Sequence, residues 1–599
     1  MQYKDTLKRI LKYTKNYKFY LIGALACAIA SVVLTLLGPV LIGRAIDNII
    51  DKGNVNFENI FYILAVIVAT IVLSSTFQWF MGLCTNKISF GTVQDLRKDI
   101  FKKYNSVPLS FIDTSVHGDL ISRTVNDIDA VGDGLLQGIT QLFSGVITIL
   151  GTLIFIVSID YKIALIVVII TPVSLVVATF IAKLCSKMFK EQQQTQGELS
   201  GYVEEIIGNQ KVSTAFLMEE QNEERFNEIN QRLYVCGHKA QFSSSLANPS
   251  TRFLNGVVYA TVGVVGAISV VNGVMSVGQL SCFLTYANQY TKPFNEITGI
   301  LTQLQTAVAG AKRVFAVLDE QDQVKDAKDA TVLTKCSGKI DIENVHFSYV
   351  PERPLIQNFN LHIKPGQRVA IVGPTGCGKT TLINLLMRFY DVNSGSIKVD
   401  DININDITRS SLRKMYGMVL QESWLYSATI KENIAYGKPD ATMEDIISAS
   451  KNAFAHSFIT QMENGYDTII SEQGGNLSQG QKQLLCIARV MLSNPPMLIL
   501  DEATSSIDTL TEKRVQEAFV KMMKDKTSFV VAHRLSTIKE SDIILVLNKG
   551  NIIEQGTHDE LIAKGGFYCN LYNSQFAKSW FKTKKRATSG CTFFQLFKV

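Results

Sequence analysis

Residues 370–386, AIVGPTGCGKTTLINLL, combine an apolar strand, a glycine-rich turn and the start of a helix. The core of this stretch, GPTGCGKT at 373–380, matches the phosphate-loop pattern in the strand–loop–helix context that the pattern requires. Glycines let backbone N–H groups wrap phosphates, Lys379 reaches the outer phosphates, and the hydroxyl of Thr380 ligates Mg²⁺. The stretch therefore predicts an α/β P-loop nucleotide-binding domain.

We expect the whole loop and the first turn of its helix to contact the nucleotide. The predicted nucleotide-binding residues of this segment are Gly373, Pro374, Thr375, Gly376, Cys377, Gly378, Lys379, Thr380 and Thr381.

A second motif, which is acidic, follows about 120 residues after the phosphate loop. Residues 495–508, PPMLILDEATSSID, form an apolar strand that ends in two carboxylates. Asp501 suits the ligand shell of Mg²⁺, and Glu502 is placed to polarise an attacking water. Two acids at a strand end can also be a solvated turn. Because the chain also holds a phosphate loop, we favour the metal-binding and catalytic interpretation.

The composition divides the chain into two unlike halves. Of its 599 residues, 47% are hydrophobic, and the long uncharged runs lie in the first three hundred. A formal net charge of +6 is modest for this length, so we expect no nucleic-acid partner. The ten cysteines are scattered and show no metal-ligand or redox spacing.

The first half predicts an all-α domain with six membrane spans. A membrane-crossing helix needs about 20 apolar residues. Uncharged runs of that size lie at 20–43, 59–82, 135–159, 163–182 and 253–291, and NGVMSVG (272–278) divides the last run into two spans. The end of the sixth span, CFLTYANQYT (282–291), is polar, which a helix tolerates where it faces a cavity inside a bundle.

Lysine and arginine set the orientation of these spans. They crowd the N-terminus and the connection that follows the second span, which places both termini and the nucleotide-binding domain in the cytoplasm. Residues 1–19 are charged and amphipathic, so we expect an interfacial helix. The long connections 83–134 and 183–252 have helical patterns and would project about 30 Å beyond the bilayer.

At this point the chain resembles the ATP-binding cassette (ABC) transporters, specifically exporters in which six spans are fused to one nucleotide-binding domain. The resemblance extends to about residue 576. Residues 476–483, NLSQGQKQ, are similar to the family signature LSGGQ. The resemblance implies that Ser478, Gly480 and Gln481 contact a nucleotide held by the opposite domain of a dimer.

Three further positions take roles from the resemblance. Tyr349, in VHFSYV, resembles the aromatic residue that stacks on adenine. Gln421 resembles the glutamine that senses Mg²⁺ and couples to the membrane helices, and His533 resembles the switch histidine at the γ-phosphate. The resemblance thus implies a catalytic set of Glu502, His533 and Gln421, and a metal set of Thr380, Gln421 and Asp501.

The membrane half is also similar to these exporters. Residues 108–131 resemble the first coupling region, and residues 201–230 resemble the second. The resulting domain prediction is an interfacial helix at 1–19, a six-span membrane domain at 20–320, a linker at 321–337, a nucleotide-binding domain at 338–576 and a basic, disordered tail at 577–599.

The implied function is ATP-driven efflux of a hydrophobic or amphipathic drug or lipid by alternating access. The chain would be a half-transporter and an ATPase, integral to a bacterial plasma membrane and in contact with membrane lipid. An importer on the same scaffold and an ATP-gated regulatory or channel-like protein are the alternatives. Phe77, Trp79, Phe80 and Met81 either line an apolar substrate cavity or pack against neighbours and lipid.

One position departs from the family pattern. Gln479 stands where the signature has its second glycine. Altered signatures occur in exporters built from two different half-chains, in which one ATP site is weak. We therefore favour a heterodimer over a homodimer, with Glu502 acting at the competent site.

Overall fold

The structure is a computed structural model that describes residues 3–49, 55–420, 423–471, 476–501, 507–531 and 535–573. The chain forms two compact units. The first comprises Met1–Val107 and Thr114–Asp322, and the second comprises Pro108–Asp113 and Gln323–Val599. The predicted tail at 577–599 lies outside the described residues.

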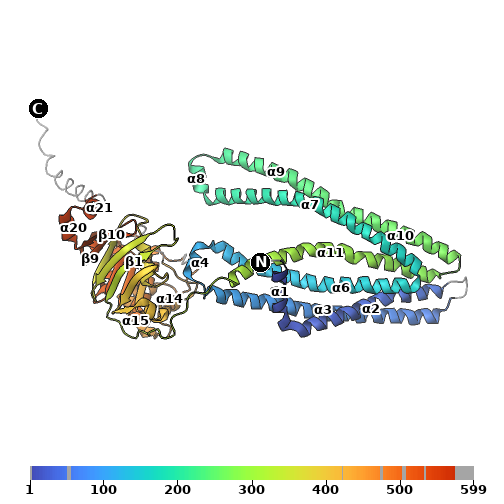
Figure 1. Ribbon diagram of the computed structural model, residues 1–599, viewed down its shortest axis with the longest axis horizontal. Helices are drawn as coiled ribbons and strands as arrows, with labels where there is room; N and C mark the ends of the chain where they lie inside the picture. Colours follow the sequence, from blue (N-terminus) through green and yellow to red (C-terminus); the bar gives the residue numbers. More distant parts are fainter. Residues whose placement is uncertain are drawn as a thin grey trace, which may run out of the picture. The chain divides into compact units, whose positions relative to one another are not determined.

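Every element of the first unit that the structure describes is a helix (Figure 1). Its elements, with the short α4 that bridges into the second unit, are α1 (Tyr3–Thr14), η1 (Lys15–Tyr17), α2 (Lys18–Asp47), α3 (Phe57–Tyr104), α4 (Leu109–Thr114), α5 (His117–Ser122), the π-helical η2 (Arg123–Asp127), α6 (Ile128–Ile159), α7 (Tyr161–Gly208), α8 (Gln210–Ala215), α9 (Glu219–Ser245), α10 (Ala247–Val271) and α11 (Val277–Leu318).

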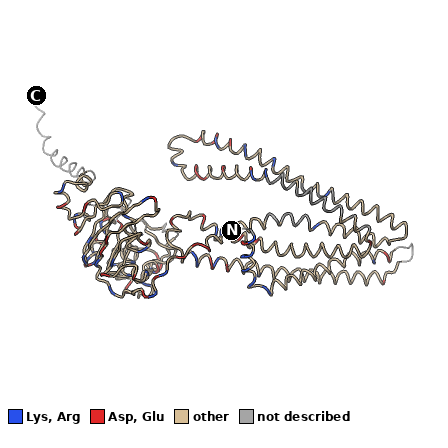
Figure 2. The backbone as a smooth tube through the Cα atoms, viewed as in Figure 1, with Lys and Arg blue, Asp and Glu red and all other residues tan. Residues whose placement is uncertain are grey.

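Helices α2, α3, α6 and α11 pack into one bundle, whereas α7 pairs with α9 and α10 (Figure 1). The α7–α9 hairpin, closed by α8, diverges from the bundle at its α8 end (Figure 1). Among the described residues, Lys4–Asp47, Phe57–Tyr104 and His117–Ile159 are long and apolar enough to cross a membrane. Asn255–Val271 is a shorter apolar helix. Figure 2 shows long stretches of these helices without charge. The count of six spans stays a prediction.

The bundle core uses both apolar packing and internal hydrogen bonds. Phe283 and Tyr286 of α11 are fully buried, and the Tyr286 hydroxyl donates to the backbone oxygen of Leu36 in α2. Ser31 and Ser74 join α2 to α3 through hydroxyls 3.1 Å apart. Such internal pairing is required because hydrocarbon offers polar groups no partners.

The outer end of α2 is fastened to the start of α11. The Asp47 carboxylate accepts hydrogen bonds from the Ser276 hydroxyl at 2.7 Å and from the Gly278 N–H at 2.8 Å. A Cβ at Gly43 would lie 2.5 Å from the backbone oxygen of Gly278. The absence of a side chain at these glycines therefore lets the two helix backbones touch.

The aromatic residues near position 79 lie on different faces of α3. Trp79 is 62% exposed and Phe80 is 47% exposed, so neither packs into the bundle. Met81 is buried against α2 and borders a cavity inside the bundle, which Gln78 also lines. Both alternatives for these residues, a substrate cavity or packing against neighbours and lipid, stay predictions.

The second unit holds two sheets. A mixed sheet has the strand order β10-β9-β3-β8-β7-β6, in which β10 is antiparallel, and an antiparallel sheet has the order β2-β1-β4-β5. The strands are β1 (Ile340–Phe347), β2 (Ile356–Ile363), β3 (Arg368–Val372), β4 (Ser394–Val399), β5 (Ile402–Asn403), β6 (Tyr416–Val419), β7 (Met497–Asp501), β8 (Thr527–Val531), β9 (Ile543–Asn548) and β10 (Asn551–Gly556).

Helices flank these sheets and build a second core beyond β6 and β7. They are α12 (Lys379–Leu386), η3 (Ile404–Asp406), α13 (Arg409–Lys414), α14 (Ile430–Ala435), α15 (Met443–Asn452), α16 (His456–Ile459), η4 (Gly465–Asp467), α17 (Gln479–Ser493), α18 (Thr509–Met523), α19 (Leu535–Lys539), α20 (His558–Lys564) and α21 (Phe567–Tyr572). The observed architecture is a helical domain followed by an α/β domain, as the sequence predicts.

Candidate nucleotide-binding site

The loop between β3 and α12 has a backbone that requires glycine. Gly376 and Gly378 have φ angles of 79° and 104°, which side chains other than glycine rarely allow. A Cβ at Gly373 would lie 2.3 Å from the backbone oxygen of Leu547 on β9. Gly378 is the N-cap of α12, so the loop leads directly into a helix N-terminus, where free N–H groups favour an anion. The loop therefore fits a phosphate chain.

Lys379 closes this loop from within. Its Nζ donates to the backbone oxygens of Gly373 at 2.8 Å and Pro374 at 3.1 Å. Thr375 and Thr380 are exposed, while Cys377 is buried and its backbone oxygen accepts from the N–H of Gly550 at 2.9 Å. The ammonium group thus lies inside the curve of the loop, where a phosphate would meet it.

Tyr349 lies beside the same helix start. Its hydroxyl is 3.2 Å from the Thr381 hydroxyl and 3.3 Å from Nδ2 of Asn384. The ring is 46% exposed and meets Tyr390 edge-on, with ring centroids 5.0 Å apart. The structure therefore brings this residue to the phosphate loop with an accessible ring, as adenine stacking would need.

Tyr390 is a residue that the sequence reasoning missed. Its hydroxyl donates to Oδ2 of Asp113 at 2.7 Å, and Asp113 belongs to α4, within the stretch 108–131 that resembles the first coupling region. Burial, together with this hydrogen bond, raises the pKa of Tyr390. An aromatic residue shortly after the phosphate-loop helix was the available signal, but 277 residues separate the two partners.

Asp501 ends β7 at the edge of the sheet that carries the phosphate loop. Strands β3, β8, β7 and β6 are parallel neighbours, so their carboxyl ends share one edge. Asp501 pairs with Val531, the last residue of β8. Two strand spacings, about 10 Å, separate the ends of β3 and β7. An acidic group beside a phosphate site suits a divalent cation.

The three predicted catalytic residues, Glu502, His533 and Gln421, lie outside the described residues. In the sequence they come one residue after β7, two residues after β8 and two residues after β6, and the carboxyl ends of these strands lie on the phosphate-loop edge.

The signature residues begin α17. Ser478 is the N-cap, and its Oγ accepts from the N–H of Gln481 while Oε1 of Gln481 accepts from the N–H of Ser478 at 2.9 Å. Gln479 is exposed, whereas Gly480 is buried and a Cβ there would lie 2.3 Å from Cγ2 of Thr511. The signature residues thus lie at the start of α17, which packs on α18. The β3–α12 loop is a separate element about a hundred residues earlier in the chain.

Asp508 fixes the start of that neighbouring helix. Its carboxylate accepts hydrogen bonds from the N–H groups of Thr511 at 2.9 Å and Leu510 at 3.1 Å. These bonds, the one from Thr511 foremost, lower the pKa of Asp508. The cap holds Thr511 against Gly480 and so stabilises the packing under the signature.

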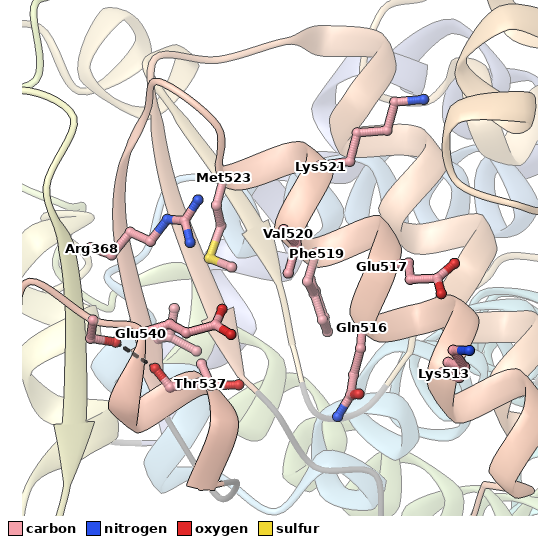
Figure 3. Close-up of a pocket in the computed structure, with 12 residues that line it drawn as sticks. Arg368, Lys513, Gln516, Glu517, Phe519, Val520, Lys521, Met523, Thr537 and Glu540 are labelled. Carbon is pink, nitrogen blue, oxygen red and sulfur yellow. Dashed lines mark hydrogen bonds between the residues drawn. The ribbon is translucent and has the colours of Figure 1, made fainter.

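A cavity of about 410 Å³ lies elsewhere in this unit, between β3, β8, α18 and α19. Figure 3 shows Arg368 and Glu540 facing Phe519 and Met523 across it. Arg368 begins β3, whereas the phosphate loop follows the other end of that strand. The cavity is therefore not part of the candidate nucleotide site.

Comparison with known proteins agrees with both units. The pattern described as ABC transporter transmembrane region matches residues 21–294, and the pattern described as ABC transporter matches residues 356–505. The uncharacterized ABC transporter ATP-binding protein YfiC of Bacillus subtilis (strain 168) is 40% identical over 575 residues, 96% of this chain and 95% of that protein. The chain belongs to the ABC transporter family.

Other relatives of this ABC transporter carry functional names. The fatty acid ABC transporter ATP-binding/permease protein of Mycobacterium bovis (strain ATCC BAA-935 / AF2122/97) is 40% identical over 524 residues, 88% of this chain and 83% of that protein. The ATP-dependent lipid A-core flippase of Syntrophus aciditrophicus (strain SB) is 36% identical over 577 residues, 96% and 95% of the two chains.

A solved structure of a bacterial Atm1-family ABC exporter with ATP bound has the same fold. The TM-score is 0.76 at 26% identity, and the match covers 93% of this chain and 98% of the other. This ABC transporter is accordingly an integral protein of the bacterial plasma membrane with a cytoplasmic ATPase domain, and it couples ATP hydrolysis to transport. These likenesses favour neither the importer nor the ATP-gated channel.

Proposed function

We propose that this ABC transporter is one half of a dimeric exporter that uses ATP to move an amphipathic molecule out of the cytoplasmic leaflet. One observation carries the nucleotide part of the proposal. A glycine-dependent loop curls around Lys379 at the same sheet edge that carries Asp501, in a chain that also has membrane-crossing helices.

Within this site, the loop N–H groups and Lys379 hold the phosphates of ATP, and Tyr349 stacks on adenine. Thr380 and Asp501, with Gln421, hold Mg²⁺, which when bound neutralises charge on the phosphate oxygens. Thr380 is exposed at the first turn of α12, which follows β3. Asp501 ends β7, two strands from β3 in the sheet, so both residues could donate oxygen ligands to one cation from the protein side.

We assign the hydrolytic step to residues that follow the strand ends. Glu502 orients the attacking water and holds its proton, and His533 contacts the γ-phosphate. Gln421 reports the state of the site to the membrane helices. Removing the carboxylate charge in Glu502→Gln would leave the ATP geometry intact while it abolishes activation of the water.

The dimer follows from the position of the signature. Half-transporters of this family dimerise, so the start of α17 has an opposite phosphate loop to meet. Ser478, Gly480 and Gln481 would bind the partner's ATP there. Gln479 is exposed at the same helix start, so its side chain would lie against that nucleotide. We favour a heterodimer in which this chain's signature faces the weaker of two sites.

The relatives named for fatty acid and lipid A-core transport support an amphipathic substrate for this chain as well.

The deciding experiment is the assembly mass and ATPase rate of the chain expressed alone and purified in lipid. An active dimer that Glu502→Gln silences would establish a homodimer with working sites and refute the heterodimer. A monomeric or inactive chain that gains activity with a second half-transporter would support the heterodimer. Absence of ATP-dependent uptake into inverted vesicles, in an assembly that hydrolyses ATP, would contradict export.

A further inference from the structure

The chain that leaves α11 is fastened within a few residues of the end of that helix. Asp319, the C-cap of α11, accepts a 2.6 Å hydrogen bond from Arg9 of α1. Asp322 accepts hydrogen bonds from Nζ of Lys103 at 2.6 Å and from the hydroxyl of Ser106 at 2.7 Å, at the C-terminal end of α3. The first unit therefore holds its own chain as far as Asp322, its last residue.

Contacts within the second unit begin two residues later. The backbone oxygen of Val324 accepts a hydrogen bond from Nη1 of Arg409 at 2.7 Å. The carboxylate of Asp326 accepts from the N–H of Arg409 at 3.0 Å and from its Nη1 at 2.8 Å. Only Gln323 lies between the two anchored residues, Asp322 and Val324, and we call these three residues the tether. The tether spans at most about 7 Å.

Arg409 belongs to a buried cluster of charges. Its Nη2 donates to Oδ2 of Asp391 at 3.0 Å. Nε of Arg388 donates to Oδ1 of the same carboxylate at 3.0 Å, and Nη1 of Arg388 lies 3.5 Å from Oδ1 of Asp326. Both arginines are buried, so without Asp326 two buried guanidinium groups would share one carboxylate. Because unpaired buried charge is strongly unfavourable, the contact with Asp326 should stay closed when the domain moves.

Arg388 joins this cluster to the end of the helix that follows the phosphate loop. α12 ends at Leu386, and the N–H of Arg388 donates to the backbone oxygen of Leu385 at 3.0 Å. Nη1 of Arg388 also donates to the backbone oxygens of Ile404 and Ile407, both at 2.9 Å. The 8 residues of α12 make a helix about 12 Å long. The phosphate loop and the charged cluster therefore lie at opposite ends of one short helix.

The same segment also holds α4. Tyr390 lies between Arg388 and Asp391 in the sequence, and its hydroxyl donates to Asp113 of α4. The chain passes from one unit to the other on either side of Pro108–Asp113 and within the tether. Both connections are therefore held, on the side of the second unit, by residues that follow α12 directly.

We propose that Asp326 is a positioning residue, held by Arg409 and Arg388, through which a nucleotide-driven displacement of α12 is passed along the tether to α11. The inference rests on the proposed function, because it assumes that ATP binds at the start of α12. It adds to that function a second route from the nucleotide to the membrane helices, besides the contact between Tyr390 and α4.

The test inserts two glycines into the tether, between Gln323 and Val324. The insertion lengthens the tether to about 14 Å and leaves the residues that anchor it unchanged. The matched control inserts two glycines between Lys328 and Asp329, in an exposed turn beyond the Arg409 contacts. A general effect of a longer linker would appear in both variants, whereas an effect of the tether would appear only in the first.

The measurement is hydrogen exchange in the purified dimeric assembly in nanodiscs, with and without AMP-PNP and Mg²⁺. Residues 373–381 report nucleotide binding, and residues 308–318 report the end of α11. The original protein and the control insertion should show a nucleotide-induced change in both regions.

The tether insertion should keep the change at 373–381 but reduce the change at 308–318 at least about threefold, because flexible glycines transmit a displacement poorly. An undiminished change at 308–318 in this variant would overturn the proposal. So would an original protein in which 373–381 responds to the nucleotide and 308–318 does not.

Point variants of the linker test the contact itself. Asp326→Ala removes the carboxylate and should reproduce the effect of the tether insertion. Asp329→Ala makes the same change at an exposed position of the same linker and should behave like the original protein. A full nucleotide-induced change at 308–318 in a folded Asp326→Ala variant would refute the role of Asp326. If that variant fails to fold, the two insertions decide.

The readouts keep this inference distinct from the proposed function, since neither transport nor hydrolysis enters the measurement. An assembly in which AMP-PNP does not change exchange at 373–381 would refute the nucleotide site, and the inference with it. An assembly that exports its substrate but shows an undiminished change at 308–318 after the tether insertion would refute only the inference. An assembly that responds as expected but does not transport would refute only the exporter.

Discussion

The hydroxyl of Tyr390 donates a 2.7 Å hydrogen bond to the carboxylate of Asp113 on α4. The ring of Tyr390 also meets the ring of Tyr349 edge-on at 5.0 Å. Tyr349 lies at the phosphate loop, and α4 lies between α3 and α6 in the chain. Two aromatic rings and one hydrogen bond therefore join the candidate nucleotide site to α4. A displacement of the Tyr349 ring on adenine binding would move the Tyr390 ring, and through its hydroxyl the carboxylate of Asp113.

Tyr390→Phe tests this connection. The variant keeps the ring against Tyr349, so ATP affinity should stay within about twofold, whereas loss of a hydrogen bond to a carboxylate should lower transport per ATP several-fold. Transport and ATPase rates measured in the same proteoliposomes give that ratio. Tyr436→Phe, at an exposed tyrosine outside the Tyr349–Tyr390 pair, is the matched control and should leave the ratio unchanged.

Gly378→Ala tests the backbone of the phosphate loop. Its φ of 104° disfavours alanine, and the shifted N–H groups should weaken ATP binding by tenfold or more. Gly366 has a φ of 78° at the turn before β3, and nothing lies within 4 Å of a Cβ added there. Gly366→Ala should therefore introduce a similar backbone strain and lower the unfolding temperature, but ATP affinity measured by nucleotide titration should not change. Equal affinity loss in both variants would contradict a specific role for the loop.

Gly480→Ala should destabilise the ATPase domain. The added Cβ would lie 2.3 Å from Cγ2 of Thr511, and overpacking of this kind costs about 1–3 kcal/mol. Denaturant unfolding followed by α17-sensitive fluorescence or circular dichroism would measure the loss. Gln479→Ala, at the exposed neighbouring residue, should stay within about 0.5 kcal/mol of the original protein. Stability that does not differ between the two variants would show that α17 shifts freely on α18.

His558 should make the domain less stable in mild acid. Burial and the nearby Lys539 lower its pKa, while its Nδ1 lies 2.7 Å from the Tyr568 hydroxyl. Above the unfolded pKa of about 6.5 the imidazole is neutral in both states and contributes no pH dependence. As the pH falls below that value, the unfolded chain binds the proton first, so the unfolding free energy falls until the pH passes the lower folded-state pKa.

The measurement is the drop in unfolding temperature between pH 7.5 and pH 5.5. His558→Gln should reduce that drop, and His346→Gln, at an exposed histidine of the same domain, should not. A drop of equal size in the original protein and in His558→Gln would assign the acid sensitivity to other groups.

The phosphate loop could be predicted from sequence because its determinants are local. An apolar strand, three glycines and a lysine specify the turn, and the structure places Lys379 inside it. The position of Asp501 could also be predicted, because a parallel sheet brings the ends of its strands to one edge. Tyr390 and Asp113 could not be paired, because no local rule links positions 277 residues apart.

The faces of the membrane helices were also beyond prediction. Around position 79, α3 is apolar on most sides, so periodicity cannot tell a wall that faces lipid from one that faces a cavity. Gln78 borders the cavity while Trp79, the next residue, is 62% exposed. The faces of α17 could be predicted, because this helix is amphipathic. Its pattern accounts for the exposed Gln479 and the buried Gly480.

The fastening of Asp47 to Ser276 and Gly278 has a mechanical consequence. The backbones of α2 and α11 are in contact at Gly43, and Asp47 accepts two hydrogen bonds from the start of α11. The outer ends of these two helices therefore move together and cannot separate without breaking both hydrogen bonds. A path for substrate toward the outer face would therefore open between other helices of the bundle, while α2 and α11 stay together.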